Sequence, residues 1–347
     1  MMAKLFRNFF DMVSNGTNLV GAVLVLYSLS HASTICDSIC GAQEYALQQK
    51  TELSAAQTAK WIPGKATQLT FDGRLKHDPI FVNQGREVVF TSLQKFNLLC
   101  LMKLELNGDP KATKPSRLHP SANTSELAIS FAEDENKFAY LRNNGNLHFE
   151  IVIENRKTGS SVSFNPGGGF AGVRNISFHP DGSHVIFAFP DQNGPQQIKT
   201  LSSDGKKTAL LTNSEGINRC PRFSNDGKKV VFASSRDGDF DIFAMNSDGS
   251  HPVNVSKSRG LDTHPVFSPD SSEIAFTGLR NGNYDIYVVK VDGSQLRRLT
   301  RSEEVDDYPA WSPDGRSIIW VAERNGKRDL YSKLVKEPGG SQRKEDK

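Results

Sequence analysis

The strongest constraint in this sequence is a unit that recurs every 44 or 45 residues. Its clearest part is an aromatic residue followed by a polar turn, seen as Phe178-His-Pro-Asp-Gly, Phe223-Ser-Asn-Asp-Gly, Phe267-Ser-Pro-Asp-Ser and Trp311-Ser-Pro-Asp-Gly. A repeat of this length, filled with short strands and glycine turns, is typical of one small sheet per repeat arranged around a central axis. The chain is therefore expected to be all-β.

A complete unit contains four strand-like segments joined by three turns. In the unit that begins at Pro221, residues 229–234 alternate as a strand after Asn225-Asp-Gly, and residues 240–245 form another after Arg236-Asp-Gly-Asp. Asp-Gly and Asn-Gly pairs supply the positive φ angles that tight hairpin turns require. The next unit repeats this order and adds a fourth segment at residues 295–300.

Weaker copies extend the array toward the N-terminus, with Phe131 lying 47 residues before Phe178 and Phe81 another 50 residues earlier. The count gives six units, so we predict a six-bladed β-propeller of four-stranded antiparallel blades over residues 66–334. The last unit lacks a fourth strand. Residues 66–70 resemble the fourth strand of the preceding unit, and we expect them to pair with residues 328–334 and close the ring without an open edge.

These repeats resemble the TolB-like propeller family, which carries tandem Ser-Pro-Asp-Gly, Asp-Ile-Tyr and Asp-Gly-Ser…Leu-Thr elements. The resemblance spans residues 66–334 and is most specific in the last four units. It implies a six-bladed propeller that serves as a binding platform. Genuine TolB also has an α/β domain ahead of its propeller, whereas only about thirty residues separate the N-terminal apolar segment from the first repeat here. We therefore expect a TolB-like protein outside the full Tol–Pal system.

The N-terminus predicts export from the cytoplasm. Lys4 and Arg7 precede an apolar run of 11 residues (19–29), and the small residues Ser30 and Ala32 suit a signal peptidase. We predict a secretory signal peptide at residues 1–32, with an uncleaved signal anchor as the alternative. A linker at 33–65 and a disordered polar tail at 335–347 complete the organisation. The expected location is periplasmic or secreted, with membrane contact only through an uncleaved N-terminal segment.

Charge and cysteine content argue against several classes of site. The formal net charge is +3 and the basic residues are scattered, so no nucleic-acid partner is expected. Cys36 and Cys40 lie near the cleavage site, whereas Cys100 and Cys220 fall in distant units and are expected to be isolated buried cysteines. No second cysteine pair completes a zinc site. We predict no metal and no cofactor, and we expect a monomer.

Aspartates recur at one position of the third strand, at Asp241, Asp285 and Asp329, with Glu150 matching them in an earlier unit. Carboxylates are suitable ligands for calcium. Repetition at one strand position instead predicts a structural hydrogen bond that each blade makes in the same way.

One ring of polar positions is a candidate binding surface. In a propeller, the loops before the innermost strands meet the turns between the second and third strands at one mouth of the channel. Three residues before the aromatic position, the six units carry Asp78, Ala128, Asn175, Cys220, His264 and Tyr308. Together with neighbouring positions, the alignment gives a tentative binding set of Asp78, His77, Asp262, His264, Arg280, Asp306, Asp307 and Tyr308.

Three kinds of function remain open. The leading hypothesis is an exported platform that binds a protein or peptide at the channel mouth. The alternatives are a lyase-like propeller enzyme acting on an acidic polysaccharide, for which His77, His264 and Asp262 are the available metal or base groups, and a purely structural envelope protein. No catalytic residues are predicted, because the sequence contains neither a Gly-x-Ser-x-Gly elbow nor a His-Glu-x-x-His motif.

Overall fold

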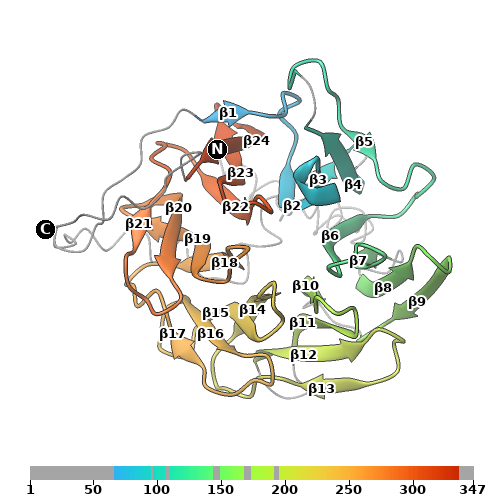
Figure 1. Cartoon of the computed structure of the whole chain (residues 1–347). Coiled ribbons are helices and arrows are strands. Elements are labelled where there is room, and N and C mark those ends of the chain that lie inside the picture. The colour runs from blue at the N-terminus through green and yellow to red at the C-terminus, as the bar shows by residue number, and fades with distance from the viewer. Residues whose placement is uncertain are drawn as a thin grey trace, which may run out of the picture. The chain divides into compact units, whose positions relative to one another are not determined.

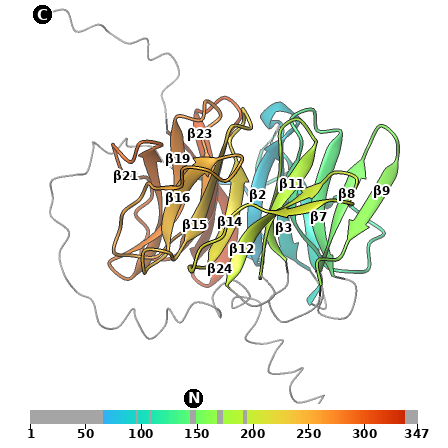
Figure 2. The ribbon, with the colours of Figure 1, turned by 90° about the horizontal axis from the view of Figure 1, so that it is seen from below.

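The structure, a computed structural model, describes residues 66–94, 97–106, 109–143, 149–167, 173–190 and 195–335. In these residues the chain forms six four-stranded sheets, and the helical structure is limited to the short 3-10 helix η1 (Asn83–Gly85). Figure 1 shows the sheets arranged as a ring around an axis, and Figure 2 shows the same sheets side-on. The prediction of an all-β, six-bladed propeller is confirmed.

Every blade is an antiparallel meander in which the first strand lies nearest the axis (Figure 1). The first three blades consist of β2 (Lys76–Val82), β3 (Glu87–Leu93), β4 (Leu99–Glu105) and β5 (Ser116–Arg117); β6 (Glu126–Phe131), β7 (Lys137–Asn143), β8 (Phe149–Asn155) and β9 (Ser160–Phe164); and β10 (Arg174–Phe178), β11 (His184–Pro190), β12 (Gln196–Ser202) and β13 (Thr208–Leu210). The last three consist of β14 (Asn218–Phe223), β15 (Lys229–Ser234), β16 (Asp241–Asn246) and β17 (Val253–Asn254); β18 (Asp262–Phe267), β19 (Glu273–Arg280), β20 (Asn283–Lys290) and β21 (Arg297–Arg298); and β22 (Asp306–Trp311), β23 (Ser317–Arg324), β24 (Lys327–Leu334) and β1 (Thr67–Gln68).

The repeated Ser-x-Asp-Gly element forms the hairpin between the first and second strands. In the fourth blade, Ser224 Oγ donates a hydrogen bond to Asp226 Oδ1 at 2.7 Å and accepts one from the amide of Lys229 at 2.9 Å. Gly227 has a φ of 70°, a conformation that glycine adopts without strain. The same Ser–Asp bond recurs at Ser268–Asp270 and Ser312–Asp314. The motif that defines the repeat in sequence is therefore a turn at the end of the ring opposite the loops that precede the inner strands.

Apolar side chains pack between neighbouring blades. Six clusters of buried residues each combine two adjacent sheets. For example, Phe90 of β3 and Ile319 of β23 belong to one cluster, and Phe232 of β15 and Ile186 of β11 to another. Burial of one such side chain contributes about 1.5–3 kcal/mol, so each sheet depends on both of its neighbours for stability.

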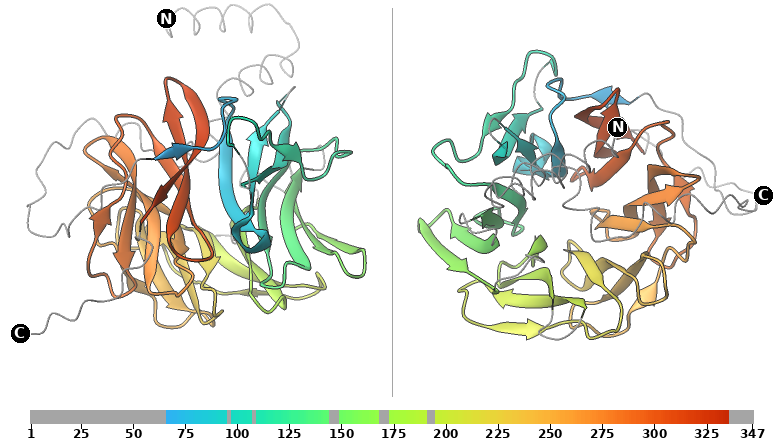
Figure 3. Two further views of the ribbon diagram at one scale, coloured as in Figure 1. Left: turned by 45° about the horizontal axis from the view of Figure 1, so that its top comes forward. Right: turned by 180° about the vertical axis from the view of Figure 1, so that it is seen from behind.

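The N-terminal strand β1 closes the ring, as the sequence predicts. Thr67 and Gln68 pair with Ser332 and Tyr331 of β24, and the strands lie side by side in Figure 3. Leu69, directly after β1, is buried in the cluster shared by the sixth and first blades. The last sheet therefore obtains its fourth strand from the other end of the propeller, which leaves no blade incomplete.

The aspartates at the start of the third strands make the repeated bond that the sequence predicts. The bond joins each carboxylate to a Ser or Thr hydroxyl beyond the fourth strand, at 3.0 Å for Asp241–Ser256, 3.3 Å for Asp285–Thr300 and 2.8 Å for Asp329–Thr70. In all three blades the hydroxyl accepts the next backbone amide at 2.9 Å. Glu150 differs from the expectation, because it accepts a bond from Arg142 at 2.8 Å instead.

Several expectations concern residues outside the described part of the chain, namely the signal peptide at 1–32, the linker at 33–65 and the tail from residue 336. Val335 is described and is buried, and its amide donates to the carbonyl of Arg316 at 2.8 Å. Strand β24 ends at Leu334, and Val335 directly after it packs in the cluster between the fifth and sixth blades. Among the described residues, no helix has the length and apolar character needed to cross a membrane.

Candidate functional site

Every innermost strand carries a β-bulge near its start. The pairing register with the second strand shifts there in all six blades. The bulged residue has a left-handed backbone with φ between 47° and 56°, at Asp78, Ala128, Asn175, Cys220, His264 and Tyr308. This conformation costs a residue with a Cβ about 1–2 kcal/mol, so its recurrence reflects a requirement of the repeat geometry. These are the six positions that the sequence alignment placed in one ring.

Five of the bulged residues line a small cavity at the axis of the ring. Its volume is about 40 Å³, and its lining includes Asp78, Asn175, Cys220, His264, Tyr308 and also Arg222 of β14. Arg222 Nη2 lies 3.4 Å from Asp78 Oδ1, which connects the fourth blade to the first across the channel. A single water needs roughly 10–15 Å³, so the cavity admits a few water-sized molecules and excludes a peptide chain.

Two histidines contact the ring of Tyr308 from different blades. His77 Nδ1 lies 2.9 Å from the Tyr308 hydroxyl, and the imidazole meets the phenol edge-on at a centroid distance of 5.1 Å. The ring of His264 stacks on the ring of Tyr308, with the two ring centroids 4.0 Å apart. Burial lowers the pKa of His77 to about 4, so this imidazole is neutral at neutral pH and serves as a hydrogen-bonding group.

His264 is oriented by the carboxylate of Asp307. Its Nδ1 lies 2.8 Å from Asp307 Oδ1, and the Thr277 hydroxyl and the Tyr308 amide each donate to the same oxygen at 2.7 Å. Burial is the largest influence and opposes ionisation of both groups. Their mutual attraction, the hydrogen bonds from Thr277 and Tyr308 to Asp307, and the contact of Cys220 with His264 together outweigh it. They lower the pKa of Asp307 to about 2 and hold the pKa of His264 well above its usual range. The pair is therefore a carboxylate and an imidazolium at neutral pH.

Cys220 lies beside this pair in the fourth blade. Its Sγ is 3.3 Å from Asn175 Oδ1 and 3.7 Å from Thr263 Oγ1, and the thiol is also hydrogen-bonded to His264. Burial is the largest influence and by itself would raise the pKa of the thiol. The charge and hydrogen bond of His264, the charge of Arg219 and the hydroxyl of Thr263 together outweigh it and lower that pKa to about 7. Cys100, by contrast, has a pKa raised by burial. Both cysteines are buried and free of disulfides, as predicted.

The structure gathers five of the eight predicted site residues around this cavity: His77, Asp78, His264, Asp307 and Tyr308. The other three lie in interior ion pairs. Asp262 accepts two hydrogen bonds from Arg280, at 2.6 and 3.0 Å, and Asp306 accepts one from Arg324 at 2.7 Å. Burial raises the pKa of both aspartates against the effect of their arginines. These pairs tie the start of each inner strand to the end of the second strand.

The three groups considered for a lyase-like centre also divide into two that contact Tyr308 and one that lies in an interior ion pair. His77 and His264 both contact Tyr308, whereas Asp262 is fully buried and engaged by Arg280. Sequence reasoning missed Arg222 as a channel residue, since it occupies a position that carries apolar or small residues in the other units. Sequence analysis placed Cys220 in the aligned ring with His264 and Tyr308 but left it out of the binding set and expected an isolated buried cysteine.

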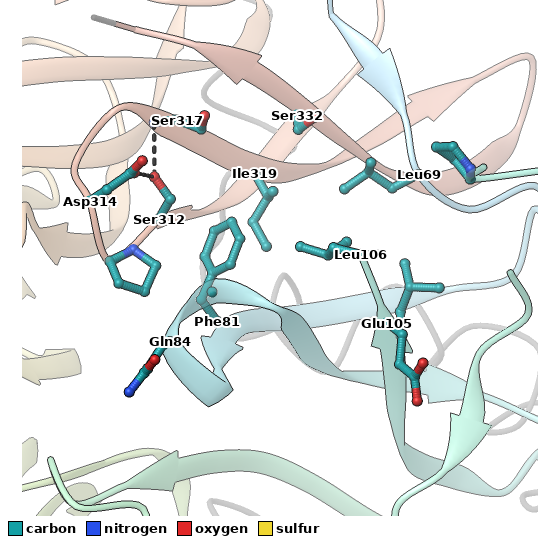
Figure 4. A pocket seen from close by; sticks show the side chains of 14 residues that line it. Leu69, Phe81, Gln84, Glu105, Leu106, Ser312, Asp314, Ser317, Ile319 and Ser332 are labelled. Carbon is teal, nitrogen blue, oxygen red and sulfur yellow. Dashed lines mark hydrogen bonds between the residues drawn. The ribbon is translucent and has the colours of Figure 1, made fainter. Parts of the chain in front are cut away.

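A second and larger cavity lies at the seam between the first and last blades. Its volume is about 400 Å³, and Figure 4 shows Phe81, Leu106 and Ile319 turned toward one another, with the hydrogen-bonded pair Ser312–Asp314 at the side. Sequence reasoning did not predict it, because its walls come from both ends of the propeller and meet only when the ring closes. Its turn residues place it at the end of the ring opposite the channel mouth.

One group of described residues has metal-ligand spacing, namely His179, Asp181 and His184, whose ligand atoms lie within 4.8 Å of one another. The existing contacts account for this arrangement without an ion. His179 Nδ1 lies 2.7 Å from Asp181 Oδ1, Ser183 Oγ is 2.7 Å from His184 Nδ1, and the two imidazoles stack at 4.8 Å. The group closes the hairpin between β10 and β11.

Solved structures of several proteins share this fold. The chain is 19% identical to a protein assigned as TolB from Agrobacterium tumefaciens, over 76% of this chain and 91% of that one, with a TM-score of 0.57. It is 20% identical to TolB from Acinetobacter baumannii, over 74% of this chain and 65% of that one, with a TM-score of 0.58. An oligogalacturonate lyase from Vibrio parahaemolyticus matches at 12% identity, over 79% and 94% of the two chains, with a TM-score of 0.52.

Identities this low establish the fold and leave the chemistry of the site undecided. The family assignment comes from the sequence itself. The family model described as the TolB beta propeller domain matches residues 109–259 and 251–344, which is more than half of the chain. The chain therefore belongs to the TolB β-propeller domain family.

Proposed function

We propose that this protein is an exported binding module that takes a segment of a protein or peptide at the channel mouth, where the inner strands begin. The proposal depends mainly on the ring of bulged residues. Their backbone geometry is the same in six blades, but their side chains all differ, and five of them are polar or reactive. Ala128 and Tyr308 also pack in the buried clusters between blades, whereas Asp78, Asn175, Cys220 and His264 present polar or ionisable groups to the axial cavity. A rigid ring of different donors and acceptors provides the oriented contacts that recognition of one partner requires.

Residues at the rim of the mouth are an argument for a macromolecular partner. Since the axial cavity is too small for a chain, the partner lies across the mouth. Phe71, in the loop that leads from β1 to the first inner strand, is 48% exposed. Asp72 and Arg74 follow it in the chain and form an exposed ion pair, with 3.8 Å between Arg74 Nε and Asp72 Oδ2. An exposed aromatic residue next to arginine is a combination enriched at the centre of protein interfaces.

Export to the periplasm or the exterior is part of the same proposal. Two observations support it: the basic and then apolar pattern of residues 1–32, and membership of a propeller family that includes TolB. An exported platform has access to envelope proteins and to extracellular peptides. Mass spectrometry of the mature N-terminus tests this part, because cleavage after Ala32 is expected and an intact Met1 in a membrane fraction would indicate an anchor.

Site-specific crosslinking tests the location of the binding surface. A photoreactive amino acid is placed at Asn281 or Glu303, which are exposed at the mouth, and at Lys228 or Arg316, which are exposed at the opposite end. We expect both mouth positions to capture the same protein or peptide, and the opposite positions to capture none of it. Capture only from Arg316, which precedes the seam cavity residue Ser317, would place the site at that cavity and overturn the proposal. Equal capture from both ends would also overturn it.

A further inference from the structure

We propose that Cys220 is a peroxide-reactive thiol, activated by His264 and Asp307, and that the axial cavity is the site of its oxidation by hydrogen peroxide or a hydroperoxide of similar size. This inference is independent of the binding role at the mouth. It concerns a side chain that the proposed function does not use.

The geometry is that of an activated nucleophile. Asp307 Oδ1 holds His264 Nδ1 at 2.8 Å, so the other ring nitrogen is the one that can meet the thiol of Cys220. Thr277 Oγ1 donates to the same carboxylate oxygen at 2.7 Å, and the ring of His264 stacks on Tyr308 at 4.0 Å. The imidazole is thus fixed in both direction and plane. A nucleophile, a base and a group that orients the base occur in one line of contacts.

The surroundings favour a thiolate over a thiol. His264 of β18 and Arg219 of β14 both lower the pKa of Cys220, and the Thr263 hydroxyl acts in the same direction against the effect of burial. Across the cavity, Arg222 forms an ion pair with Asp78, with 3.4 Å between Arg222 Nη2 and Asp78 Oδ1. The sulfur lies 3.7 Å from the Thr263 hydroxyl and 3.3 Å from Asn175 Oδ1, to which the protonated thiol donates, so ionisation of Cys220 gives up that one bond and gains the imidazolium as a charged partner. A thiolate beside an imidazolium is the reactive form of cysteine.

The size of the cavity selects the co-reactant. Cys220 is 4% exposed, and the space in front of it is about 40 Å³. This volume holds a few water-sized molecules, so it accommodates hydrogen peroxide and excludes a peptide or a sugar. Bulky electrophiles should therefore react poorly at this thiol even though it is ionised.

The reaction is balanced with the groups present. The thiolate of Cys220 attacks one peroxide oxygen, an S–O bond forms and the O–O bond breaks. The departing hydroxide takes the proton of the His264 imidazolium and leaves as water. The sulfur is oxidised by two electrons to a sulfenic acid, and the peroxide is reduced by two electrons. Asn175 and Thr263 lie within reach of the modified sulfur.

The test uses the full chain. Cys100, the other free cysteine among the described residues, is the internal control. The protein is treated with hydrogen peroxide, sulfenic acid is trapped with a cyclic 1,3-diketone, and peptide mass spectrometry measures labelling of each cysteine against pH. A pKa that falls from 9.0 to about 7 raises the thiolate fraction at neutral pH about fiftyfold and lowers intrinsic nucleophilicity roughly eightfold. We therefore expect Cys220 to react roughly sixfold faster than it does in the unfolded chain, and Cys100 to remain unlabelled.

Two variants separate activation from structure. In His264→Gln the reaction of Cys220 at neutral pH should slow by roughly sixfold or more, and the difference should narrow at alkaline pH, where the thiolate forms without help. Cys100→Ser should leave the reaction unchanged. The proposal is overturned if Cys100 reacts as fast as Cys220, or if His264→Gln retains the wild-type pH profile. If His264→Gln does not fold, the wild-type profile decides, and a midpoint at the ordinary thiol pKa would refute the inference.

Discussion

In the outer strands the same hydrogen bond recurs with the same types of residue, whereas around the channel the same backbone bulge recurs with six different side chains. Asp241, Asp285 and Asp329 all accept a bond from a Ser or Thr hydroxyl. The bulged positions instead carry a carboxylate, a methyl, an amide, a thiol, an imidazole and a phenol. The repeat fixes the geometry at both places, but only in the outer strands does it also fix the chemistry.

This difference distinguishes scaffold from site. A residue whose partner repeats with it is explained by the stability of the blade. A residue that varies while its backbone stays constant is explained by something outside the blade, which is a ligand or a reaction in the two proposals above. The comparison predicts that changes in the outer strands mainly affect stability. Changes around the channel should mainly affect binding, pH response and thiol reactivity.

Removal of the closing strand should have the largest effect. Deletion of residues 66–70 removes the partner of β24, the buried side chain of Leu69 and the hydroxyl that bonds Asp329. We expect the free energy of unfolding to fall by about 3–5 kcal/mol, together with a loss of soluble yield, since an edge and a buried carboxylate are exposed. Urea unfolding measures the change. An unaltered unfolding midpoint would mean that the ring is closed by other contacts.

A matched pair of Asp→Asn variants tests the comparison directly. Asp285 has a fully buried side chain and bonds Arg298 at 2.6 Å, so Asp285→Asn should cost about 2–3 kcal/mol of stability. Asp78 contacts Arg222 at 3.4 Å, and asparagine tolerates its left-handed backbone, so Asp78→Asn should cost less than about 1 kcal/mol. Denaturant unfolding of both variants gives the two values. An equal or larger cost at Asp78 would show that the channel residues also belong to the scaffold.

The channel should give the protein a specific loss of stability in acid. Below its ordinary pKa of 6.5, His77 gains a proton in the unfolded chain but not in the folded one until the pH reaches about 4. The free energy of unfolding should therefore fall as the pH drops through this window, by roughly 1–2 kcal/mol from this group once its partial exposure is allowed for. Thermal unfolding of His77→Asn between these pH values should show a shallower decline. Identical pH curves for both proteins would contradict the assignment.

The smallest expected change in stability, and the clearest change in binding, concerns Phe71. Phe71→Ala should alter stability by less than about 0.5 kcal/mol, since Phe71 is 48% exposed, but should weaken binding of the crosslinked partner by about 1–2 kcal/mol. Lys228→Ala, at the opposite end, is the matched control and should change neither. Titration calorimetry measures both affinities. Salt should slow association if charged rim residues take part, and equal binding by the two variants would exclude this part of the rim.

Much of the fold could be predicted from the sequence because the repeat is local. Asp-Gly turns, alternating strands and an aromatic position are all decided within a few residues, and their spacing gives the number of blades. The exchange of β1 to the last sheet was also predictable, since the final unit lacks a strand that residues 66–70 can supply. The repeated carboxylate bond followed from residue type and position alone, with Glu150 as the exception.

The site could be predicted only in part, for a physical reason. Alignment placed Asp262, Asp306 and His264 near one mouth, but a sequence position does not tell which side chain is neutralised by a neighbour. Asp262 and Asp306 are each paired with an arginine from the adjacent strand. His264 instead lines the axial cavity, at a bulge where its backbone is left-handed.

The sequence by itself determined the number of blades, the order of strands and the way in which the ring closes, because these depend on turns and periodicity along the chain. Only the tertiary structure decided that Cys220, His264 and Asp307 meet, and that Arg222 reaches Asp78. These five residues come from four blades, the first, fourth, fifth and sixth. Their distances depend on the radius and tilt of the closed ring, which are set by the packing of all six sheets together.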